Sequence, residues 1–545
     1  MRSIDEILAS LSLEEKVAQL SCGGRCYELP ELSGGSVDVE ALLVRFPYGT
    51  GQLGRPSVGR DQTAARQLTT AVQTAIREGT RAGIGVLFNE EGVHGVMGGG
   101  ATVFPAALGL GATWDPALVE AVYAAVAREC RARGSNYIYA PVLDLARDPR
   151  WGRVEETFGE DPHHVATMGV AAVVGLEGTG DRIAPDRVLA CAKHFVGHGM
   201  PQAGTNAAPI TIGERELRRD HLLPFRTVID RANVGAIMVA YNELDGIPMH
   251  SNARWITTVL RDELGFAGMV TSDGFGMHQL ETVHRVARDP ADAALLAFAA
   301  GIDCEIPEPM CAPSLVEHVR SGRLATDVVD RACRNVLTAK DRLGLLDTEA
   351  QTDSISIDRP AHRDLARRAA ERAIVLLTNG RGRLPLDASS SGVMLVCGPN
   401  AAHAHLGGYT DPDAAGSSVL DGLRTRFESW TVDYEEGCRI TDDPAGPKTW
   451  WQDEIRLADP AADDDRMTCA VAAAATADVA VVVVGGNEAT HREGWWFDHL
   501  GDRAELTLAG RQDELIERIA ATGTPTVAMV ISAGPVDLRR VVAVA

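Results

Sequence analysis

The sequence lacks the features of a membrane protein or of a nucleic-acid-binding protein. Its most apolar run, ADVAVVVVGG (residues 477–486), is far shorter than the about 20 residues that cross a bilayer. Lysine and arginine (52) are outnumbered by aspartate and glutamate (75), and the net charge of −23 repels nucleic acids and anionic lipids. We therefore predict a soluble globular protein whose partner is neither a nucleic acid nor a membrane.

Export and metal-binding signals are also missing. The first stretch, MRSIDEILASLSLEEKVAQL, has no long apolar core and no small-residue cleavage site, so we expect a cytoplasmic protein. Its SLEE segment (residues 12–15) is typical of a helix capping box. The 10 cysteines are scattered, and Cys22 and Cys26 form a close pair without a second pair to complete a metal site. We expect reduced cysteines, no metal and no other cofactor.

Strand-like runs alternate with helical patterns over residues 84–306. Helical segments such as PALVEAVYAAVARECRAR carry apolar residues at a spacing of three and four. At least six strand–helix units over about 300 residues predict a (β/α)8-like TIM barrel, which we place at residues 1–345. The strand-like runs are IGVLF (84–88), NYIYAPVLD (136–144), RVLACAKHFV (187–196), GAIMVAY (235–241), AGMVTSD (267–273) and AGIDCEI (300–306).

A second α/β region follows the barrel. Helical patterns such as AGRQDELIERIAAT separate runs with the composition of buried parallel strands, so we predict a doubly wound α/β sandwich domain at residues 371–545. The polar, proline-marked residues 346–370 are the predicted linker. The strand candidates are AIVLLTN (373–379), GVMLVCGP (392–399), ADVAVVVVGG and PTVAMVISAG (525–534).

Polar side chains stand where the predicted barrel strands end. The carboxyl ends of the strands of a parallel barrel meet at one mouth, so groups at these positions should surround a single site. The interior strand would then serve as a rigid mount, and the small residues after Asp273 would leave room for a ligand. The candidates are Glu91, Arg153, Lys193, His194, Tyr241 and Asp273.

Five of these candidates also have a simpler structural explanation. Asp273 precedes a glycine, as turn aspartates commonly do. Lys193 and His194 could be a structural pair in which the lysine neutralises a buried acid, and Arg153 could tie down its own loop, RDPRWGR. Tyr241 could be a core residue. The residues alone leave these alternatives open.

Six ordered segments resemble glycoside hydrolase family 3. The similarity is dense from about residue 10 to 345 and thinner beyond it. It implies a retaining exo-β-glycosidase that removes terminal β-D-glucosyl or β-D-xylosyl residues from a β-linked oligosaccharide or an aryl or alkyl glycoside. The segments are LFNEEGVHGV, ATVFPAALGLGATWDP, APVLDLARDPRWGRVEETFGEDP, ACAKHFVGHG, GAIMVAYNELDGIPMH and GFAGMVTSDGFGM.

The resemblance also implies residue roles. Asp273 matches the family's nucleophile, and Arg153, Lys193 and His194 match positions that hydrogen-bond the hydroxyls of the terminal sugar. Tyr241 matches a further position around that sugar. Lys193 and Arg153 would lower the pKa of Asp273 and keep it ionised.

Two positions depart from the family pattern. Glu91 stands where many members have aspartate and resembles the xylosidase-like branch, in which the longer side chain crowds the space for a hydroxymethyl group. This leaves glucose and xylose both open. Gly274 replaces a tryptophan that often follows the nucleophile, which removes one aromatic wall.

The resemblance places the proton donor on a loop of the second domain, here GGNEATHREGWWFDHLGDR (485–503). Glu488 and Glu493 are its two candidates. We favour Glu493, because the EG pair that it begins resembles the family's EG before DR. Trp495 and Trp496 would form an apolar, sugar-stacking wall that raises the pKa of the carboxyl group.

Two other functions remain open at this stage. A Schiff-base lyase would use Lys193 as its nucleophile, and a non-catalytic sugar-binding protein would lack a working acid. The sequence ends at GPVDLRRVVAVA, where relatives continue the second sheet. We therefore expect either a fragment or a protein whose open sheet edge is covered in a homo-oligomer.

Overall fold

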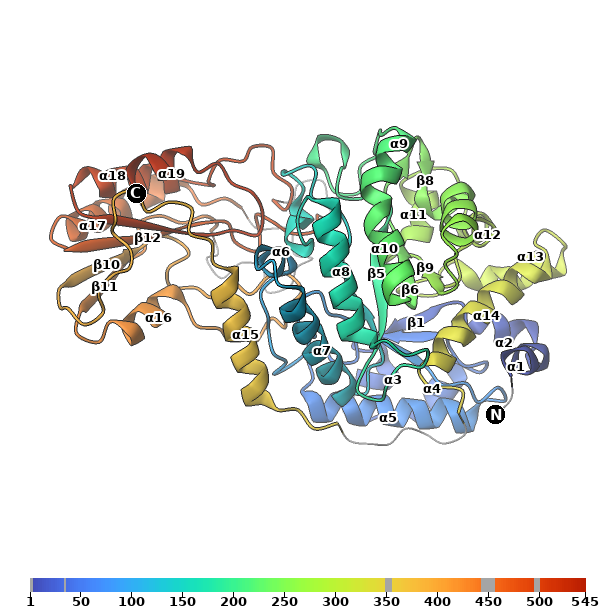
Figure 1. Ribbon diagram of the computed structural model, residues 1–545. Helices are drawn as coiled ribbons and strands as arrows, with labels where there is room; N and C mark the ends of the chain where they lie inside the picture. The colour runs from blue at the N-terminus through green and yellow to red at the C-terminus, as the bar shows by residue number, and fades with distance from the viewer. Residues whose placement is uncertain (1–2, 34–35, 348–354, 443–455, 495–499) are drawn as a thin grey trace.

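The computed structural model describes residues 3–33, 36–347, 355–442, 456–494 and 500–545, which form two α/β units side by side (Figure 1). The first unit is a parallel sheet in the order β1-β2-β3-β4-β5-β6-β9. Residues 304 and 305 close it, because Thr271 forms a parallel bridge with Cys304 and Ser21 forms one with Glu305. The predicted TIM-like barrel is thus confirmed. Its strands are β1 (Cys22–Arg25), β2 (Gln52–Gly54), β3 (Leu87–Glu91), β4 (Tyr137–Tyr139), β5 (Leu189–Phe195), β6 (Ala236–Val239) and β9 (Met269–Thr271).

Helices wrap the outside of this sheet and bury their apolar faces against it. The predicted capping box starts one of them: the Glu15 N–H donates to Ser12 Oγ (3.2 Å) and the Ser12 N–H donates to Glu15 Oε2 (2.8 Å). The helices are α1 (Ile4–Ser10), α2 (Leu13–Ala18), α3 (Pro30–Ser33), α4 (Val39–Arg45), α5 (Gln62–Gly79), α6 (Ala107–Ala112), α7 (Pro116–Ala132), α8 (Pro162–Glu177), α9 (Glu214–Glu216), α10 (Leu222–Ala232), α11 (Gly276–Thr282), α12 (Pro290–Ala300), α13 (Leu315–Arg320) and α14 (Thr326–Arg342), with the 3₁₀ helix η1 (Gly152–Glu156) and the π-helices η3 (Leu217–His221) and η5 (Arg254–Glu263). A two-stranded hairpin, β7 (Glu243–Leu244) and β8 (Ile247–Pro248), lies outside the barrel sheet.

The second unit has a four-stranded parallel sheet in the order β11-β10-β12-β13. Alternate residues of β10 and β12 face opposite sides: Leu395 and Val482 pack with α17, α18 and α19, whereas Met394 and Val481 pack with α16. This is the predicted doubly wound layer. Its elements are β10 (Val393–Cys397), α16 (Val419–Arg426), β11 (Thr431–Glu435), α17 (Asp464–Ala474), β12 (Val479–Gly485), α18 (Gln512–Ala521), β13 (Thr526–Ile531) and α19 (Arg539–Val544).

One strand prediction in the second unit is wrong. The AIVLLTN run is not a strand, and its large apolar side chains are exposed, from 59% at Val375 to 75% at Ile374. A strand needs a neighbour for its backbone hydrogen bonds, and no described strand pairs with this run. The fourth strand of the sheet is β11 instead, whose TVDYE sequence was not singled out.

The predicted linker region contains a helix. Helix α15 (Arg359–Ala373) begins inside residues 346–370 and packs on α6 and α7 of the barrel (Figure 1). Arg372 near its end forms an ion pair with Asp115, the N-cap of α7. The chain is therefore anchored on the barrel before it enters the second sheet.

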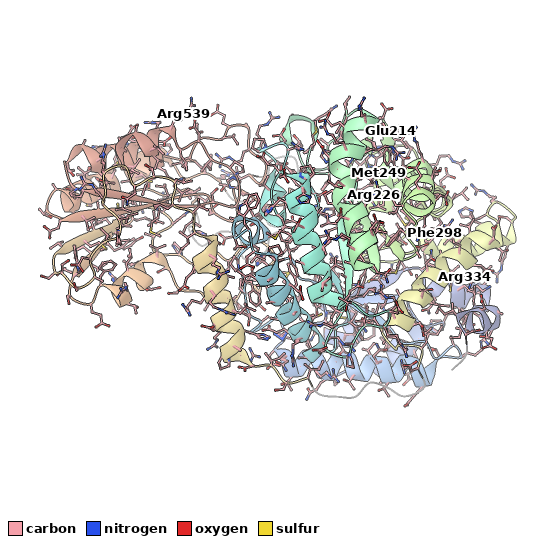
Figure 2. All side chains as sticks on the ribbon, in the orientation of Figure 1. Glu214, Arg226, Met249, Phe298, Arg334 and Arg539 are labelled. Atoms are coloured by element: carbon pink, nitrogen blue, oxygen red, sulfur yellow. The ribbon has the colours of Figure 1, made fainter. Side chains whose placement is uncertain are left out.

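Charged side chains on the barrel's outer surface include Glu214 and Arg334 (Figure 2). Glu214 pairs with Arg218 and Arg254, and Arg334 pairs with Asp5. Exposed pairs of this kind contribute little stability each, about 0–1 kcal/mol. Among the described helices, none combines the length and the apolar character needed to cross a bilayer.

Candidate active site

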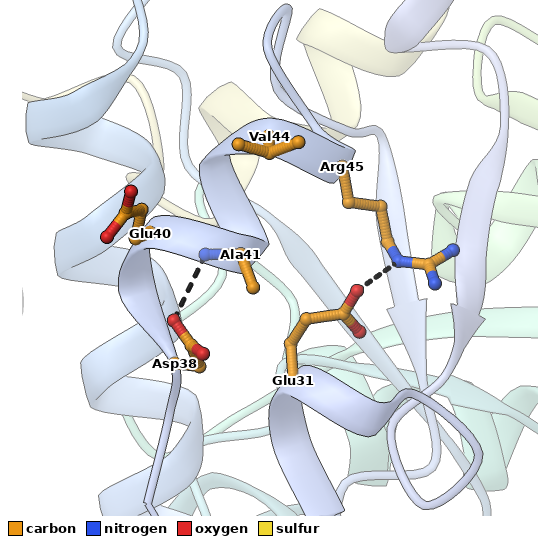
Figure 3. A pocket seen from close by; sticks show the side chains of 6 residues that line it. All are labelled: Glu31, Asp38, Glu40, Ala41, Val44 and Arg45. Carbon is orange, nitrogen blue, oxygen red and sulfur yellow. Dashed lines mark hydrogen bonds and ion pairs between the residues drawn. The ribbon is translucent and has the colours of Figure 1, made fainter.

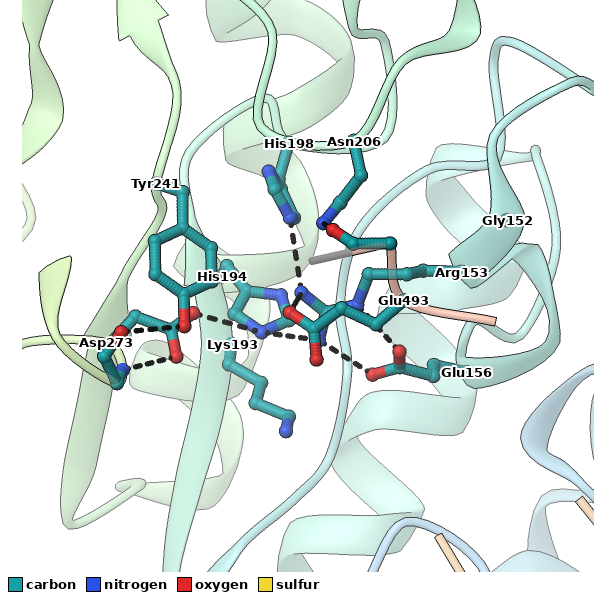
Figure 4. A network of polar contacts seen from close by, with 12 residues as sticks. Gly152, Arg153, Glu156, Lys193, His194, His198, Asn206, Tyr241, Asp273 and Glu493 are labelled. Atoms are coloured by element: carbon teal, nitrogen blue, oxygen red, sulfur yellow. Dashed lines mark hydrogen bonds and ion pairs between the residues drawn. The ribbon is translucent and has the colours of Figure 1, made fainter. Parts of the chain in front are cut away.

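A cavity of about 530 Å³ opens between the carboxyl ends of the barrel strands and the second domain. Six of the seven site residues predicted from the sequence line it. His194 lies directly behind its wall, with Nε2 3.5 Å from Asp273 Oδ2. Figure 4 shows how all of these side chains except Glu91 converge. The six lining residues are Glu91, Arg153, Lys193, Tyr241, Asp273 and Glu493.

Backbone groups hold Asp273 at the end of its strand. Strand β9 ends at Thr271, and the Asp273 N–H donates to His250 Nε2 (3.1 Å). The Gly274 N–H donates to Asp273 Oδ1 (2.7 Å), and the Tyr241 hydroxyl donates to the Gly274 carbonyl (2.9 Å). A Cβ atom at residue 274 would lie only 3.3 Å from Tyr241 Oη. The glycine therefore lets Tyr241 approach the turn that carries the carboxylate.

The pKa of Asp273 is raised rather than lowered. Burial, which leaves the residue 8% exposed, raises the pKa of its carboxyl group to about 6, although the charges of Arg153 and Lys193 act in the opposite direction. The expectation of a net lowering is therefore wrong, because desolvation outweighs the two cations. At neutral pH the carboxyl group is still mostly ionised.

Arg153 is the hub of the polar network. Its guanidinium donates to both oxygens of Glu156 (2.6 and 2.8 Å) and, from Nη1, to Glu493 Oε1 (2.9 Å). It also faces the Nε2 atoms of His194 (3.0 Å) and His198 (3.2 Å). Because a guanidinium can only donate, both histidine nitrogens accept, and neither is free to bind a metal.

Asp144 fixes the orientation of His194. Its Oδ2 accepts from the backbone N–H of His194 (3.1 Å) and from Nδ1 (2.7 Å). Burial and the nearby Arg153 charge hold the pKa of His194 well below its usual range, so the ring is neutral. Burial also raises the pKa of Asp144 to about 8. Asp144 ends the run NYIYAPVLD, the same strand-end signal as Asp273, but it was not singled out.

A second charge cluster lies deep in the cavity around Glu91. Arg55 Nη2 donates to Glu91 Oε1 (2.8 Å), and Lys193 Nζ lies 3.5 Å from Oε2. Burial tends to raise the pKa of Glu91, but Lys193 and Arg55 outweigh it and the net shift is downward. Burial likewise opposes the charge on Lys193, yet Glu91 raises the pKa of its ammonium group. The cluster is therefore ionised, and Arg55 is a member that sequence reasoning missed.

The 485–503 loop reaches the cavity because it is tied to the barrel. Asp502 accepts hydrogen bonds from the backbone N–H groups of Gly152 (2.7 Å) and Asn206 (2.6 Å). The Asn206 side chain donates to the Gly494 carbonyl (3.2 Å), and the Arg503 N–H donates to the Arg150 carbonyl (2.8 Å). The described part of the loop thus points toward the barrel mouth.

The two acids of this loop have different environments. Glu493 lines the cavity, and burial raises its pKa to about 7, with the Arg153 charge opposing. Glu488 does not line it: its carboxylate accepts from His405 Nδ1 (2.8 Å) and from the Leu406 N–H (3.0 Å). Burial tends to raise the pKa of Glu488, but the His405 hydrogen bond and charge, together with backbone hydrogen bonds, outweigh burial and the net shift is downward. Trp495 and Trp496 lie outside the described residues.

A second cavity-lining side chain from the second domain, Tyr409, was missed by sequence reasoning. Its hydroxyl donates to Glu493 Oε2 (2.8 Å), and its ring centroid lies 5.4 Å from Lys193 Nζ. Its local sequence, GGYTDP, carries no strand-end signal. The cavity therefore brings together two carboxyl groups with raised pKa values, one from each domain.

Another cavity lies on the barrel surface beside α4 (Figure 3). Arg45 pairs with Glu31 (2.7 Å), and the Asp38 side chain caps α4 by accepting from the Ala41 N–H (3.0 Å). These polar groups satisfy one another and maintain the local fold.

Comparison with known families gives two matches in the expected order. The model of the glycosyl hydrolase family 3 N-terminal domain matches residues 12–339, and that of the C-terminal domain matches residues 374–544. The chain belongs to glycosyl hydrolase family 3. Both halves of the candidate active site therefore lie within family 3 domains.

Individual family 3 proteins are similar over most of this chain. A β-xylosidase of Formosa agariphila is 34% identical over 84% of the chain and 64% of its own length. A periplasmic β-glucosidase of Salmonella typhimurium is 30% identical over 98% of the chain and 68% of its own length. The chain thus spans about two thirds of the length of these relatives. A solved β-glucosidase from Erythrobacter marinus is 36% identical, with a TM-score of 0.94 over 99% of this chain and 72% of that one.

Proposed function

We propose that the protein is a retaining exo-β-glycosidase that hydrolyses terminal β-D-glucosyl or β-D-xylosyl residues. Asp273 is the nucleophile and Glu493 is the acid/base. The observation that carries this proposal is that the two carboxyl groups share one cavity, where burial raises the pKa of Asp273 to about 6 and that of Glu493 to about 7. Glycoside hydrolysis requires two such carboxyl groups, one as nucleophile and one as proton donor.

The proposed reaction has two steps. In the first, an oxygen of Asp273 attacks the anomeric carbon while Glu493 gives its proton to the glycosidic oxygen, so the aglycone leaves as an alcohol. In the second, the Glu493 carboxylate takes a proton from water, and the water oxygen displaces Asp273 from the anomeric carbon. The sugar leaves with its original configuration, and both carboxyl groups return to their starting protonation states.

The charge clusters support recognition of a terminal sugar. Lys193 offers hydrogen-bond donors close to Asp273, beside Arg153 and with His194 behind them. Glu91 and Lys193 are 5% and 3% exposed, so the deep end of the cavity is closed to a longer chain. This supports an exo mode of attack. The relatives named above include both a β-xylosidase and a β-glucosidase, so both sugars belong to the proposal.

The environment of Lys193 disfavours a Schiff-base lyase. A lysine nucleophile must be neutral, whereas Glu91 raises the pKa of this buried ammonium group. The presence of Glu493 in the cavity likewise disfavours a purely sugar-binding protein, because binding alone requires no second carboxyl group of raised pKa.

The proposal is tested with nitrophenyl β-glucoside, β-xyloside, α-arabinoside and β-N-acetylglucosaminide. We expect turnover of the first or second, with the β-anomer as the first product in a proton NMR time course. Asp273→Ala should lower kcat by roughly 10⁴-fold or more, and azide should restore turnover to Glu493→Ala. Absence of turnover on the whole panel, or full activity of Asp273→Ala, would reject the function.

A further inference from the structure

The loop between β10 and α16 delivers Tyr409 to the cavity next to Glu493. Tyr409 is 7% exposed and lines the cavity, although its loop belongs to the second domain. Its hydroxyl lies 2.8 Å from Glu493 Oε2, and its ring covers the Lys193 ammonium group. The second domain therefore contributes two adjoining polar side chains to the site.

Several contacts fix the loop that carries Tyr409. Glu488 accepts from His405 Nδ1 and from the Leu406 N–H, which joins this loop to the 485–503 loop. Gly407 has a φ of +87°, and a Cβ atom there would lie 3.1 Å from His94 Nε2 of the barrel. A side chain at residue 407 would therefore be strained and crowded. The loop is clamped between the two domains immediately before Tyr409.

The two oxygens of Glu493 have partners of different chemistry. Oε1 accepts from the Arg153 guanidinium, which can only donate. Oε2 faces the Tyr409 hydroxyl, which can donate one proton and also accept one. When Glu493 is protonated, its proton therefore belongs on Oε2, where Tyr409 can accept it. When Glu493 is ionised, Tyr409 can donate.

We propose that Tyr409 is the positioning residue of the proton donor, holding Glu493 Oε2 by donating to the carboxylate and accepting from the acid. This inference rests on the proposed function, because it gives Glu493 the acid role in the first step and the base role in the second. Turning the hydroxyl supports each form without moving the glutamate. Arg153 alone would stabilise the ionised form only.

Other charged and titratable groups also face Glu493. They come from η1, from the residues after β6 and from the turn after β9, and they remain in place when only the Tyr409 hydroxyl is removed. A shift of the pH profile in Tyr409→Phe is therefore caused by loss of that hydroxyl. The groups are Arg153, Glu156, Tyr241 and Asp273.

The test is Tyr409→Phe, with Tyr434→Phe as the matched control. Tyr434 is a half-buried tyrosine of β11, away from the cavity. The Tyr409 hydrogen bond lowers the pKa of Glu493, so its loss raises that pKa and keeps the acid protonated to higher pH. We expect the basic limb of the kcat/KM profile to move to higher pH, and kcat to fall roughly tenfold with KM little changed. Tyr434→Phe should match the parent.

A second readout does not depend on turnover. Titration of the Glu493 carboxyl carbon by NMR, assigned from its disappearance in Glu493→Gln, should give a higher midpoint in Tyr409→Phe than in the parent. A parent without hydrolysis on any glycoside overturns the proposed function. An active parent whose basic limb and carboxyl midpoint are unchanged in Tyr409→Phe overturns the role of Tyr409 alone.

Discussion

Arg153 Nη1 lies 2.9 Å from Glu493 Oε1, and the two side chains are 1% and 4% exposed. This buried ion pair joins the barrel to the second domain inside the cavity. Removing one partner of such a pair leaves an uncompensated buried charge, so the pair couples the position of Glu493, the proposed proton donor, to the docking of the domains. The predictions that follow test this arrangement.

The pH dependence of kcat/KM should be bell-shaped. The first step needs Asp273 ionised and Glu493 protonated, and burial raises the pKa of these carboxyl groups to about 6 and about 7. Activity should therefore fall below about pH 6 as Asp273 takes a proton, and above about pH 7 as Glu493 loses one. The two limbs belong to the interacting pair rather than to separate residues. An acidic limb near pH 4 would mean that Asp273 is well solvated.

Glu493→Gln and Glu488→Gln should behave differently. Glu493→Gln removes the proposed proton donor, so we expect kcat on a poorly activated alkyl glycoside to fall by roughly 10²–10⁴-fold, with a smaller loss on a nitrophenyl glycoside. Glu488→Gln keeps one carbonyl oxygen for His405 or Leu406 and should show no such dependence on the leaving group. Steady-state kinetics on a leaving-group series makes the comparison. The opposite pattern would move the acid to Glu488.

Glu91→Asp should shift the sugar preference toward glucosides. The shorter side chain opens the space that a hydroxymethyl group would occupy, and it also weakens the contact with Arg55. One methylene in a binding pocket changes discrimination by roughly 10–200-fold, so the glucoside to xyloside ratio of kcat/KM should rise about tenfold or more. Glu28→Asp, at another position lining the cavity, is the matched control and should leave the ratio unchanged. An unchanged ratio in Glu91→Asp would remove Glu91 from sugar selection.

Gly152→Ala should lower turnover strongly while the barrel stays folded. A Cβ atom at residue 152 would lie 2.1 Å from the Arg492 carbonyl and 2.6 Å from the Gly501 carbonyl, so the 485–503 loop must move. A displacement of about 1 Å at a catalytic group can cost roughly 10²-fold in rate, and we expect a loss of that order in kcat. Gly213→Ala, whose Cβ atom would contact nothing within 4 Å, is the control. Circular dichroism should show the same helix content in both variants. Full activity of Gly152→Ala would mean that the loop tolerates displacement.

Much of the barrel could be predicted from strands with strong apolar runs. RVLACAKHFV and GAIMVAY gave β5 and β6 because buried parallel strands carry continuous apolar side chains. Strands β1 and β2 were missed, because CGGR and QLG are short and rich in glycine. Their pairing is set by the closure of the barrel rather than by their own composition.

The run at Ile374–Leu377 was the opposite case, because it was predicted as a strand and does not form one. Its composition is typical of a buried strand, yet strand formation depends on a partner that composition does not contain. The site residues likewise divide into those that composition could predict and those that depend on the tertiary fold. Asp273 and Lys193 follow apolar runs and could be found, whereas Arg55 and Tyr409 reach the cavity from irregular segments whose path depends on the tertiary fold.

Because the two carboxyl groups come from different domains, the rate of turnover depends on how the domains are docked. Asp273 is mounted on the barrel and Glu493 on the neighbouring sheet, so loosening the contacts around Gly152 and Asn206 would separate them while each sheet remains intact. A low concentration of denaturant should then abolish hydrolysis without changing the far-ultraviolet circular dichroism spectrum.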